Sequence, residues 1–212
     1  MRRMDARGLN RGTSGNASVR LGDEVLITPS GVGLDALDAG SMVRMSIDGV
    51  PRDAGAVPSS EWPLHTAVLR ARADAVAVVH AHPPYATALA CARRGIAPLH
   101  YMVAVAGGAD VRCAPYATFG SDALGEHTVS ALEGRQACLL ANHGLVAIGP
   151  SLDRALWVAE EVEFLARLQL LASAAGGAVL LTEAEIADAA ERFRTYGPRR
   201  GGPPRGRTNS SI

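Results

Sequence analysis

Apolar and polar residues alternate along the chain with two different periods, and each period predicts a different element. Short apolar runs bounded by turn residues are typical of buried strands. The predicted strands are residues 25–28, 43–47, 76–80, 137–141 and 145–148. Longer segments with apolar residues three and four positions apart predict helices. The predicted helices are residues 61–73, 85–92, 121–132, 151–175 and 182–195. Mixed strands and helices of this kind predict an α/β fold with helices packed outside the sheet.

Serine, proline and glycine mark where several of these elements begin or end. Ser59 and Ser60 suit the N-cap of the helix that contains Pro63, with Glu61 in its first turn. Ser121 is the expected cap of the helix that follows it. From residue 198 the chain is rich in Arg, Pro and Gly and low in apolar residues, so we expect a disordered tail at 198–212. The remaining 1–197 is the length of one domain with a full core.

Composition narrows the class of protein. Hydrophobic residues make up 48% and charged residues 20%, as in ordinary globular domains. The formal net charge is zero, so we expect neither nucleic acid nor an anionic membrane as a partner. No apolar run approaches the roughly 20 residues of a membrane helix, and no apolar stretch follows the N-terminal charges as in a secretory signal. The scattered Cys91, Cys113 and Cys138 indicate reduced thiols and a cytoplasmic location.

Lysine is missing from the sequence, because all 21 residues counted as Lys or Arg are arginine. Schiff-base catalysis needs a lysine amine, and a P-loop needs its lysine beside the phosphates. Both mechanisms are therefore excluded for this chain.

Three histidines form a candidate metal site. His80 and His82 stand two positions apart at the end of a predicted strand, so their side chains point to the same face. His143 follows a second predicted strand. Three neutral imidazoles from strand ends fit catalytic zinc, which takes three protein ligands and keeps one open position. The His-x-His pair alone is weak evidence, because it is more typical of surface or core histidines hydrogen-bonded to the backbone. We interpret His65, His100 and His127 as structural.

Small polar residues recur in three segments, 12–16, 28–31 and 59–61. Each offers hydroxyl groups or free backbone N–H groups, and the third opens a helix, where the macrodipole favours an anion. Singly they are ordinary turns, but together with a metal site they suggest a phosphate cradle built without lysine. Glu61 would stand beside this cradle, where a carboxylate is well placed to act as a general base.

These segments together resemble the class II aldolase/epimerase family. The resemblance is collinear over nearly the whole chain before the tail. The matching segments are GLNRGTSGNASVR, VLITPSG, PSSEW, VVHAHP, LHYMVAVAGG, CAPYATFGS, NHGL, ALWVAEEVE and ERFRTYG. HYM…AGG followed by CAPYATFG is similar to the aldolase branch and not to the epimerase branch.

The resemblance implies an α/β fold with a central, mainly antiparallel sheet, in a homotetramer whose active sites lie between subunits. It implies zinc as the cofactor, with His80, His82 and His143 as ligands. Glu61 would be the acid/base and would approach the metal when substrate is absent. Tyr101 of a neighbouring subunit would protonate the aldehyde oxygen, and Phe119 and Tyr196 would line the aldehyde pocket. The implied phosphate ligands are Asn16, Ser30, Gly31, Ser59 and Ser60.

The activity implied is cleavage of a ketose 1-phosphate, with L-fuculose 1-phosphate as the expected substrate, to dihydroxyacetone phosphate and L-lactaldehyde. Three other enzyme activities of the family remain open: a deoxypentulose-phosphate aldolase, a ribulose-5-phosphate 4-epimerase and a methylthioribulose-phosphate dehydratase. A non-catalytic scaffold like the adducin head domain is the alternative of a different class. Such domains can lose the metal histidines and the base, whereas His80, His82, His143 and Glu61 are all present here.

Two departures from the family pattern concern Asn142 and the N-terminus. Asn142 stands where an aldolase of this family has another histidine, which is not a metal ligand. Family members carry a helix before the GLN segment, but only seven residues precede it here, so we expect that helix to be missing.

Overall fold

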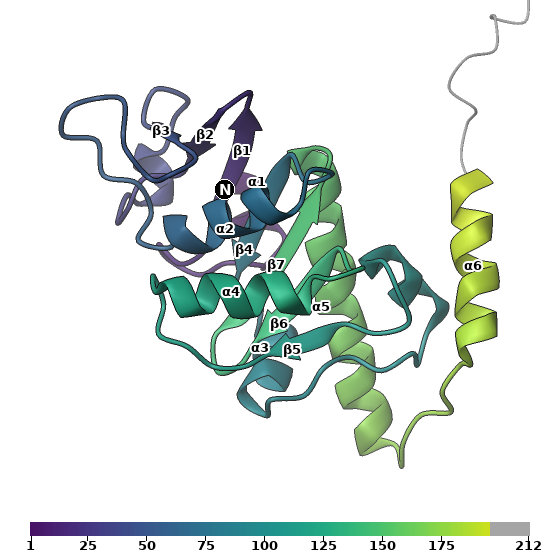
Figure 1. Cartoon of the computed structure of the whole chain (residues 1–212). Coiled ribbons are helices and arrows are strands. Elements are labelled where there is room, and N and C mark those ends of the chain that lie inside the picture. The colour runs from purple at the N-terminus through teal and green to yellow at the C-terminus, as the bar shows by residue number, and fades with distance from the viewer. Residues whose placement is uncertain (196–212) are drawn as a thin grey trace, which may run out of the picture.

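A seven-stranded sheet with the order β3-β2-β1-β4-β7-β6-β5 forms the centre of the molecule (Figure 1). The computed structural model describes residues 1–195. Its strands are β1 (Asn16–Leu21), β2 (Glu24–Ile27), β3 (Val43–Ser46), β4 (Ala77–Ala81), β5 (Arg112–Ala114), β6 (Ala137–Leu140) and β7 (Gly144–Gly149).

Strand pairing is antiparallel throughout this sheet except between β5 and β6, which run parallel. The three central strands set the register of the molecule: Asn16 of β1 lies opposite His80 of β4, and His80 lies opposite Val146 of β7. This confirms the prediction of an α/β domain with a mainly antiparallel central sheet.

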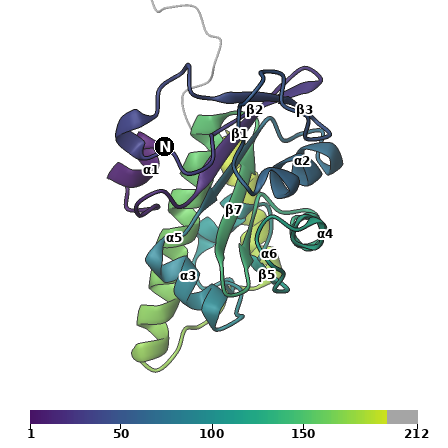
Figure 2. The ribbon, with the colours of Figure 1, turned by 90° about the vertical axis from the view of Figure 1, so that its left-hand side faces the viewer.

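Helices cover both faces of the sheet (Figure 2). Helices α2 and α4 pack together on one face, and α1, α3 and α5 lie on the other. Helix α6 contacts the 3₁₀ segment η2 at one end of the molecule. The helical segments are α1 (Arg2–Ala6), α2 (Trp62–Ala71), α3 (Pro84–Cys91), α4 (Asp122–Ala131), α5 (Leu152–Ala174), α6 (Glu183–Thr195), η1 (Leu34–Ala36) and η2 (Tyr101–Ala106).

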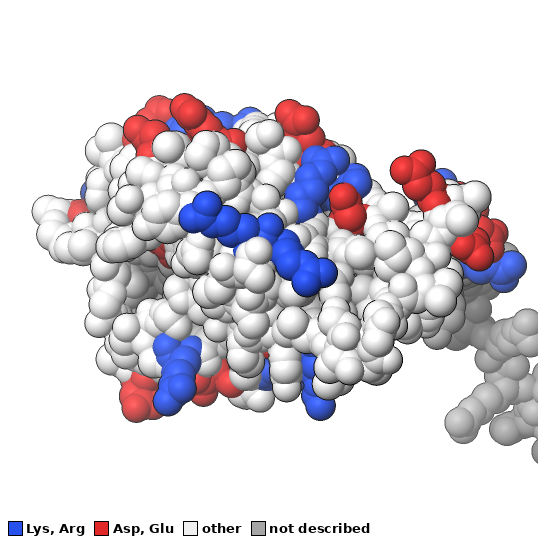
Figure 3. All heavy atoms as spheres, turned by 90° about the horizontal axis from the view of Figure 1, so that it is seen from below, with Lys and Arg blue, Asp and Glu red and all other residues white. Residues whose placement is uncertain are grey.

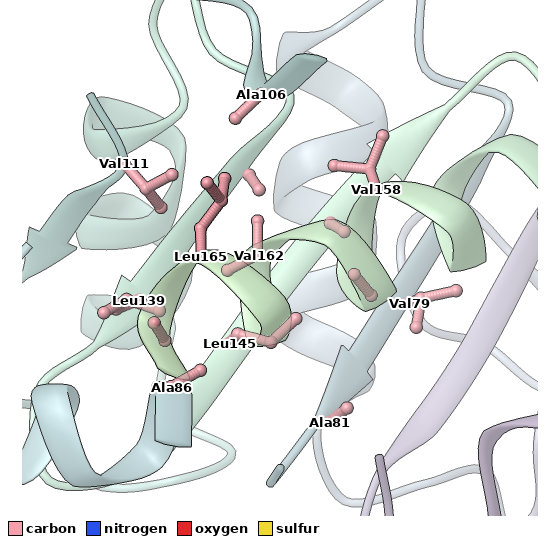
Figure 4. Close-up of a cluster of buried hydrophobic side chains, with 14 of the residues drawn as sticks. Val79, Ala81, Ala86, Ala106, Val111, Leu139, Leu145, Val158, Val162 and Leu165 are labelled. Atoms are coloured by element: carbon pink, nitrogen blue, oxygen red, sulfur yellow. The ribbon is translucent and has the colours of Figure 1, made fainter. Parts of the chain in front are cut away.

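Strand alternation divides the core into two clusters. Val79 and Ala81 of β4 point toward α5, where Val158, Val162 and Leu165 meet them at helical spacing (Figure 4). The neighbouring residues Val78 and His80 have the opposite parity and face the α2 side. Alternate residues of β4 therefore fill the two core clusters, and His80, at the end of the second set, reaches the candidate site.

The predicted elements are largely confirmed, with three differences. Strand β1 was missed because its first residues look like a polar turn, and its Ser18 and Arg20 break the apolar pattern. Strand β5 has only three residues, too few for a periodic signal. Helix α2 begins one residue later than expected: Glu61, not a serine, occupies its N-cap position and makes no capping bond there. The Ser59 hydroxyl instead accepts a hydrogen bond from the Glu61 amide at 3.3 Å.

The N-terminal residues form a helix where we expected none. Arg2–Ala6 make a short helix whose Met4 is buried in the core beside Leu9. Arg7 pairs with Glu160 of α5 at 3.5 Å, which helps to hold this segment on the sheet face. The tail at 198–212 and Tyr196 lie outside the described residues.

The surface carries charges of both signs. On the face seen in Figure 3, separate arginines and small groups of acidic side chains stand on a largely uncharged surface. None of the helices between residues 1 and 195 is long and apolar enough to cross a membrane.

Candidate active site

Three strand ends meet at one edge of the sheet and carry the predicted metal ligands. Because β1 and β7 both run antiparallel to β4, the first residue of β1, the end of β4 and the start of β7 lie together. Asn16 is the first residue of β1, His80 lies near the end of β4 and His143 directly precedes β7. Glu61 reaches the same edge from the residue before α2.

Glu61, His80, His82 and His143 form one cluster, with a ligand atom from each lying within 4.8 Å of the others. The Nε2 atoms of His80 and His82 are 2.8 Å apart. Glu61 Oε2 lies 3.0 Å from His80 Nε2, and Glu61 Oε1 lies 3.2 Å from His143 Nε2. The structure thus brings together all four residues that the sequence assigned to the metal.

Backbone contacts and burial prepare the imidazoles to bind a cation. His80 Nδ1 donates to the Leu145 carbonyl at 2.9 Å, which turns Nε2 toward the cluster. Burial, and then the neighbouring His80, lower the pKa of His82 and of His143 to about 4 against the partial opposition of Glu61. Neutral imidazoles with free lone pairs are the form that ligates a metal.

The Glu61 carboxylate is held charged although it is buried. Burial raises its pKa, but His80, the Asn16 amide and His143 act against burial and bring the pKa well below its ordinary value. Asn16 Nδ2 donates to Glu61 Oε2 at 2.8 Å. The other oxygen, Oε1, is buried and has no hydrogen-bond partner of good geometry among residues 1–195.

This donor set fits a divalent metal. A buried carboxylate oxygen without a hydrogen bond is costly unless a cation satisfies it. Three imidazole nitrogens and one carboxylate are ligands that zinc and similar transition metals accept. His80, His82, His143 and Glu61 are therefore the residues that would hold such an ion.

A cavity of about 350 Å³ opens beside the cluster. The three small polar segments line it: residues 13–16, Pro29 to Gly31, and Ser59 with Ser60. They meet because Ser59 N donates to the Thr28 carbonyl at 2.9 Å and Pro29 bridges to Pro58. All five predicted phosphate ligands lie at this cavity. Its lining within the described chain contains no arginine.

Two glycines allow the loops to approach closely. A Cβ on Gly144 would stand 2.4 Å from the Ala81 carbonyl oxygen and 2.7 Å from the His82 ring. A Cβ on Gly120 would stand 2.7 Å from the Ser60 carbonyl oxygen, and its φ of +74° also favours glycine. The first contact seats His82 against β7, and the second holds the loop with Phe119 against Ser60.

Phe119, predicted for the aldehyde pocket, and Tyr101, predicted to protonate the aldehyde oxygen, lie in two different places. Phe119 lines the cavity, where it is 64% exposed. Tyr101 lies elsewhere, on η2, where its ring stacks on Phe193 of α6 with centroids 6.0 Å apart. Tyr101 is half exposed and lines a wide groove beside α6, so it does not join the site of its own chain.

Some residues at the site were not predicted from the sequence. Tyr116 and Asn142 line the cavity. Asn142 adopts a left-handed conformation with φ of 54°, and its side chain accepts a hydrogen bond from Arg93 Nε at 3.0 Å. His65, interpreted as structural, bonds to Asn16 at the edge of the site. None of these contacts has a signal in the spacing, because each joins segments distant in sequence.

Comparisons with known proteins agree with this site. Residues 1–170 match the model of the Class II Aldolase and Adducin N-terminal domain family. The chain is 47% identical over 193 residues to L-fuculose phosphate aldolase of Escherichia coli (strain K12), covering 91% of this chain and 89% of that protein. It is 45% identical over 196 residues to a 5-methylthioribulose-1-phosphate/5-deoxyribulose-1-phosphate aldolase of Rhodospirillum rubrum, covering 92% and 88%.

A solved structure gives the same result for the fold. An L-fuculose 1-phosphate aldolase superposes with a TM-score of 0.88 at 40% identity, over 91% of this chain and 92% of that one. The match extends over the sheet, and the four metal-binding residues are present at its edge. The chain therefore belongs to the class II aldolase and adducin family, as a metal-dependent aldolase.

Proposed function

We propose that this enzyme cleaves L-fuculose 1-phosphate to dihydroxyacetone phosphate and L-lactaldehyde, with zinc as its metal. The observation that carries the proposal is the adjacency of the polar cradle and the Glu61–histidine cluster in one cavity. A phosphate on carbon one stays with the dihydroxyacetone half, close to the bond that breaks. A phosphate on carbon five would stand at the far end of the substrate and need a different binding site.

The chain's own residues supply binding and proton transfer. Hydroxyl and backbone N–H groups of Ser30, Gly31, Ser59 and Ser60 would hold the phosphate, and this binding positions the reacting carbons. When bound, the ion supplies a Lewis acid that draws electron density from the substrate carbonyl. In the condensation direction Glu61 takes the proton from the hydroxyl-bearing carbon of dihydroxyacetone phosphate.

A second proton transfer would complete the reaction. In the condensation direction the aldehyde oxygen gains negative charge and must be protonated. We assign this step to Tyr101 of a neighbouring subunit in a homotetramer, since Tyr101 is half exposed and remote from its own site. Phe119 and Tyr116, at the exposed rim of the cavity, would border the aldehyde.

A second candidate substrate follows from the Rhodospirillum rubrum relative, which is named for 5-methylthioribulose 1-phosphate and 5-deoxyribulose 1-phosphate. These are also ketose 1-phosphates, so the same cradle would serve them. An apolar pocket separates substrates that differ by one methylene by only about 1–3 kcal/mol, and we expect the chain to cleave more than one.

The direct test is release of dihydroxyacetone phosphate, measured with glycerol-phosphate dehydrogenase, from each ketose 1-phosphate and from ribulose 5-phosphate. We expect the highest kcat/KM with L-fuculose 1-phosphate. A higher value with a deoxypentulose 1-phosphate would favour the second candidate. Interconversion of 5-phosphates without dihydroxyacetone phosphate would replace the proposal with an epimerase.

Metal and subunit assignments have separate tests. A chelator should abolish cleavage and zinc should restore it, whereas full activity of metal-free protein would contradict the metal assignment. Mixed tetramers of inactive Tyr101→Phe and inactive His82→Ala chains should regain activity, because some of their sites receive both intact residues. No recovery in verified mixed tetramers would contradict the assignment of Tyr101 to a neighbouring subunit's site.

A further inference from the structure

A chain of buried polar side chains runs from the candidate site into the core between β1 and α2. The Ser18 hydroxyl contacts His65 Nδ1 at 2.7 Å, and His65 Nε2 contacts Asn16 Oδ1 at 2.5 Å. Asn16 Nδ2 then contacts Glu61 Oε2 at 2.8 Å. His65 is fully buried, and Ser18 is 1% exposed.

The direction of each hydrogen bond follows from the Glu61 carboxylate, which can only accept and therefore takes the Asn16 Nδ2 donor. Asn16 Oδ1 can only accept, so His65 Nε2 carries the ring proton and donates it. The neutral ring then accepts at Nδ1, and the Ser18 hydroxyl donates there. At the other end Asn16 Nδ2 donates to the carboxylate of Glu61. Burial, and then the nearby His80, lower the pKa of His65 to about 3 against the effect of Glu61, which agrees with a neutral ring.

The Glu61 carboxylate can only accept, so it takes Nδ2 of the Asn16 amide and leaves Oδ1 facing His65. With His65 protonated at Nε2, a reversed amide would place Oδ1 against the carboxylate and Nδ2 against an N–H group. The Glu61 oxygen that receives the Asn16 bond is the one 3.0 Å from His80 Nε2. The orientation of Asn16 therefore holds the carboxylate against the metal-binding histidines.

The hydrogen-bonded network of Ser18, His65 and Asn16 lies in apolar surroundings. Ser18 and His65 lie on the face of the sheet where Ile27, Leu64 and Val78 form the core. Burying polar groups in such a place costs free energy unless they are hydrogen-bonded to one another. Packing alone therefore gives no reason for a histidine at position 65.

We propose that His65 is a positioning residue of the active site, which fixes the Asn16 amide and through it the Glu61 carboxylate. The link to catalysis rests on the proposed role of Glu61 in proton transfer, whereas the link to metal binding does not. Removing His65 frees the amide to rotate, and the carboxylate loses its fixed partner. Partners of metal ligands typically change metal affinity about 10- to 100-fold when they are removed.

The first experiment measures the ring tautomer in the metal-free protein by ¹⁵N NMR with labelled histidine. We expect His65 to be protonated at Nε2 and not at Nδ1. The opposite tautomer would reverse the Asn16 amide and overturn the inference. This result is independent of the proposed reaction, because it requires neither metal nor substrate.

The second experiment measures zinc affinity by competition with a chromophoric chelator. His65→Leu should weaken zinc binding about tenfold, whereas His65→Gln, which keeps a donor and an acceptor, should recover most of the affinity. In an Asn16→Ala background the His65→Leu change should have less than about a twofold effect, since the link to Glu61 is already broken.

An equal loss of zinc affinity in both backgrounds, or a lower Tm with unchanged zinc affinity, would assign His65 a purely structural role. If His65→Leu fails to fold, Ser18→Ala provides the same test, because Ser18 is the end of the hydrogen-bonded network that lies farthest from Glu61. It should weaken zinc binding about two- to fivefold. Unchanged zinc affinity in Ser18→Ala would then overturn the inference.

Discussion

Two regions carry residues to which we assign a role in the reaction: the metal-binding cluster with its cavity, called here the strand-edge site, and the contact of η2 with α6, called the η2–α6 region. Their side chains are held differently. At the strand edge, Glu61 and His80 are buried and each is bonded to other residues of the site. In the η2–α6 region, Tyr101 is half exposed and touches mainly His100 and Phe193. Groups that stabilise charge need a fixed position in a dry environment, which a single chain provides here only at the strand edge.

The two regions also differ in what surrounds them. The strand-edge cavity is narrow, about 350 Å³, and polar groups from three loops line it. The groove beside α6 is about 1640 Å³ and has Trp157 and Phe193 among its walls. The first is a size suited to a small phosphorylated substrate. The second is several times larger and lies away from the metal-binding cluster.

The largest effect expected from this comparison is that of Glu61→Gln, which keeps the size of the side chain and removes its basicity. Loss of a general base typically costs about 100- to 10,000-fold in rate. We expect a fall in kcat of this order in the dihydroxyacetone phosphate assay. His127→Asn, on α4 and outside the cavity, is the matched control and should retain activity. Turnover by the Gln variant within about threefold of wild type, at equal zinc content, would show that Glu61 is not the base.

Acid should destabilise the fold through the histidines of the metal-binding cluster. The pKa of His143 is about 4 in the folded protein and about 6.5 when unfolded, so the unfolded chain binds more protons between these values. The free energy of unfolding is therefore highest above pH 6.5 and falls as the pH drops toward 4. We expect a loss of roughly 1–3 kcal/mol from this histidine.

Urea unfolding of metal-free protein across this pH range measures the effect. His143→Asn removes the titrating group and should flatten the dependence. An unchanged slope in that variant would mean that His143 is not held neutral by the fold.

A smaller effect is expected from the turn that leads into His143. Asn142 has a φ of 54°, a conformation that asparagine tolerates and β-branched residues do not. Asn142→Val should cost about 1–2 kcal/mol of stability and weaken zinc binding by shifting His143. Asn142→Gly, which suits the same backbone, is the control and should keep zinc affinity. Equal zinc affinities of the two variants would mean that the turn does not orient His143.

The smallest effect concerns the η2–α6 region itself. Phe193→Leu removes the ring that stacks on Tyr101 but keeps an apolar side chain. Aromatic pairs of this kind are worth about 0.5–1.5 kcal/mol. We expect a small fall in Tm and unchanged zinc affinity. Because α6 holds the Tyr101 ring, we also expect a modest loss of activity. A loss of zinc from this variant would contradict the independence of the two regions.

Elements with a clear local signal were predicted well from the sequence. The apolar run before His80 and the long amphipathic pattern of α5 both appear in the structure as expected, and Ser121 caps α4 by accepting from Leu124 N at 3.3 Å. Strand β1 was not predicted, because its start reads as a turn and its pairing with β2 and β4 supplies what its composition lacks.

The chemistry of the site was determined by the sequence, and its geometry by the tertiary structure. The spacing of His80 and His82 at a strand end made them candidate metal ligands, and the absence of lysine excluded Schiff-base chemistry, because side-chain alternation and functional groups are local properties. The contact of Glu61 with two of those rings, the bond from His65 to Asn16 and the exposure of Tyr101 depend on strand register and helix docking. These arise only when residues far apart in sequence pack together, so no local pattern contains them.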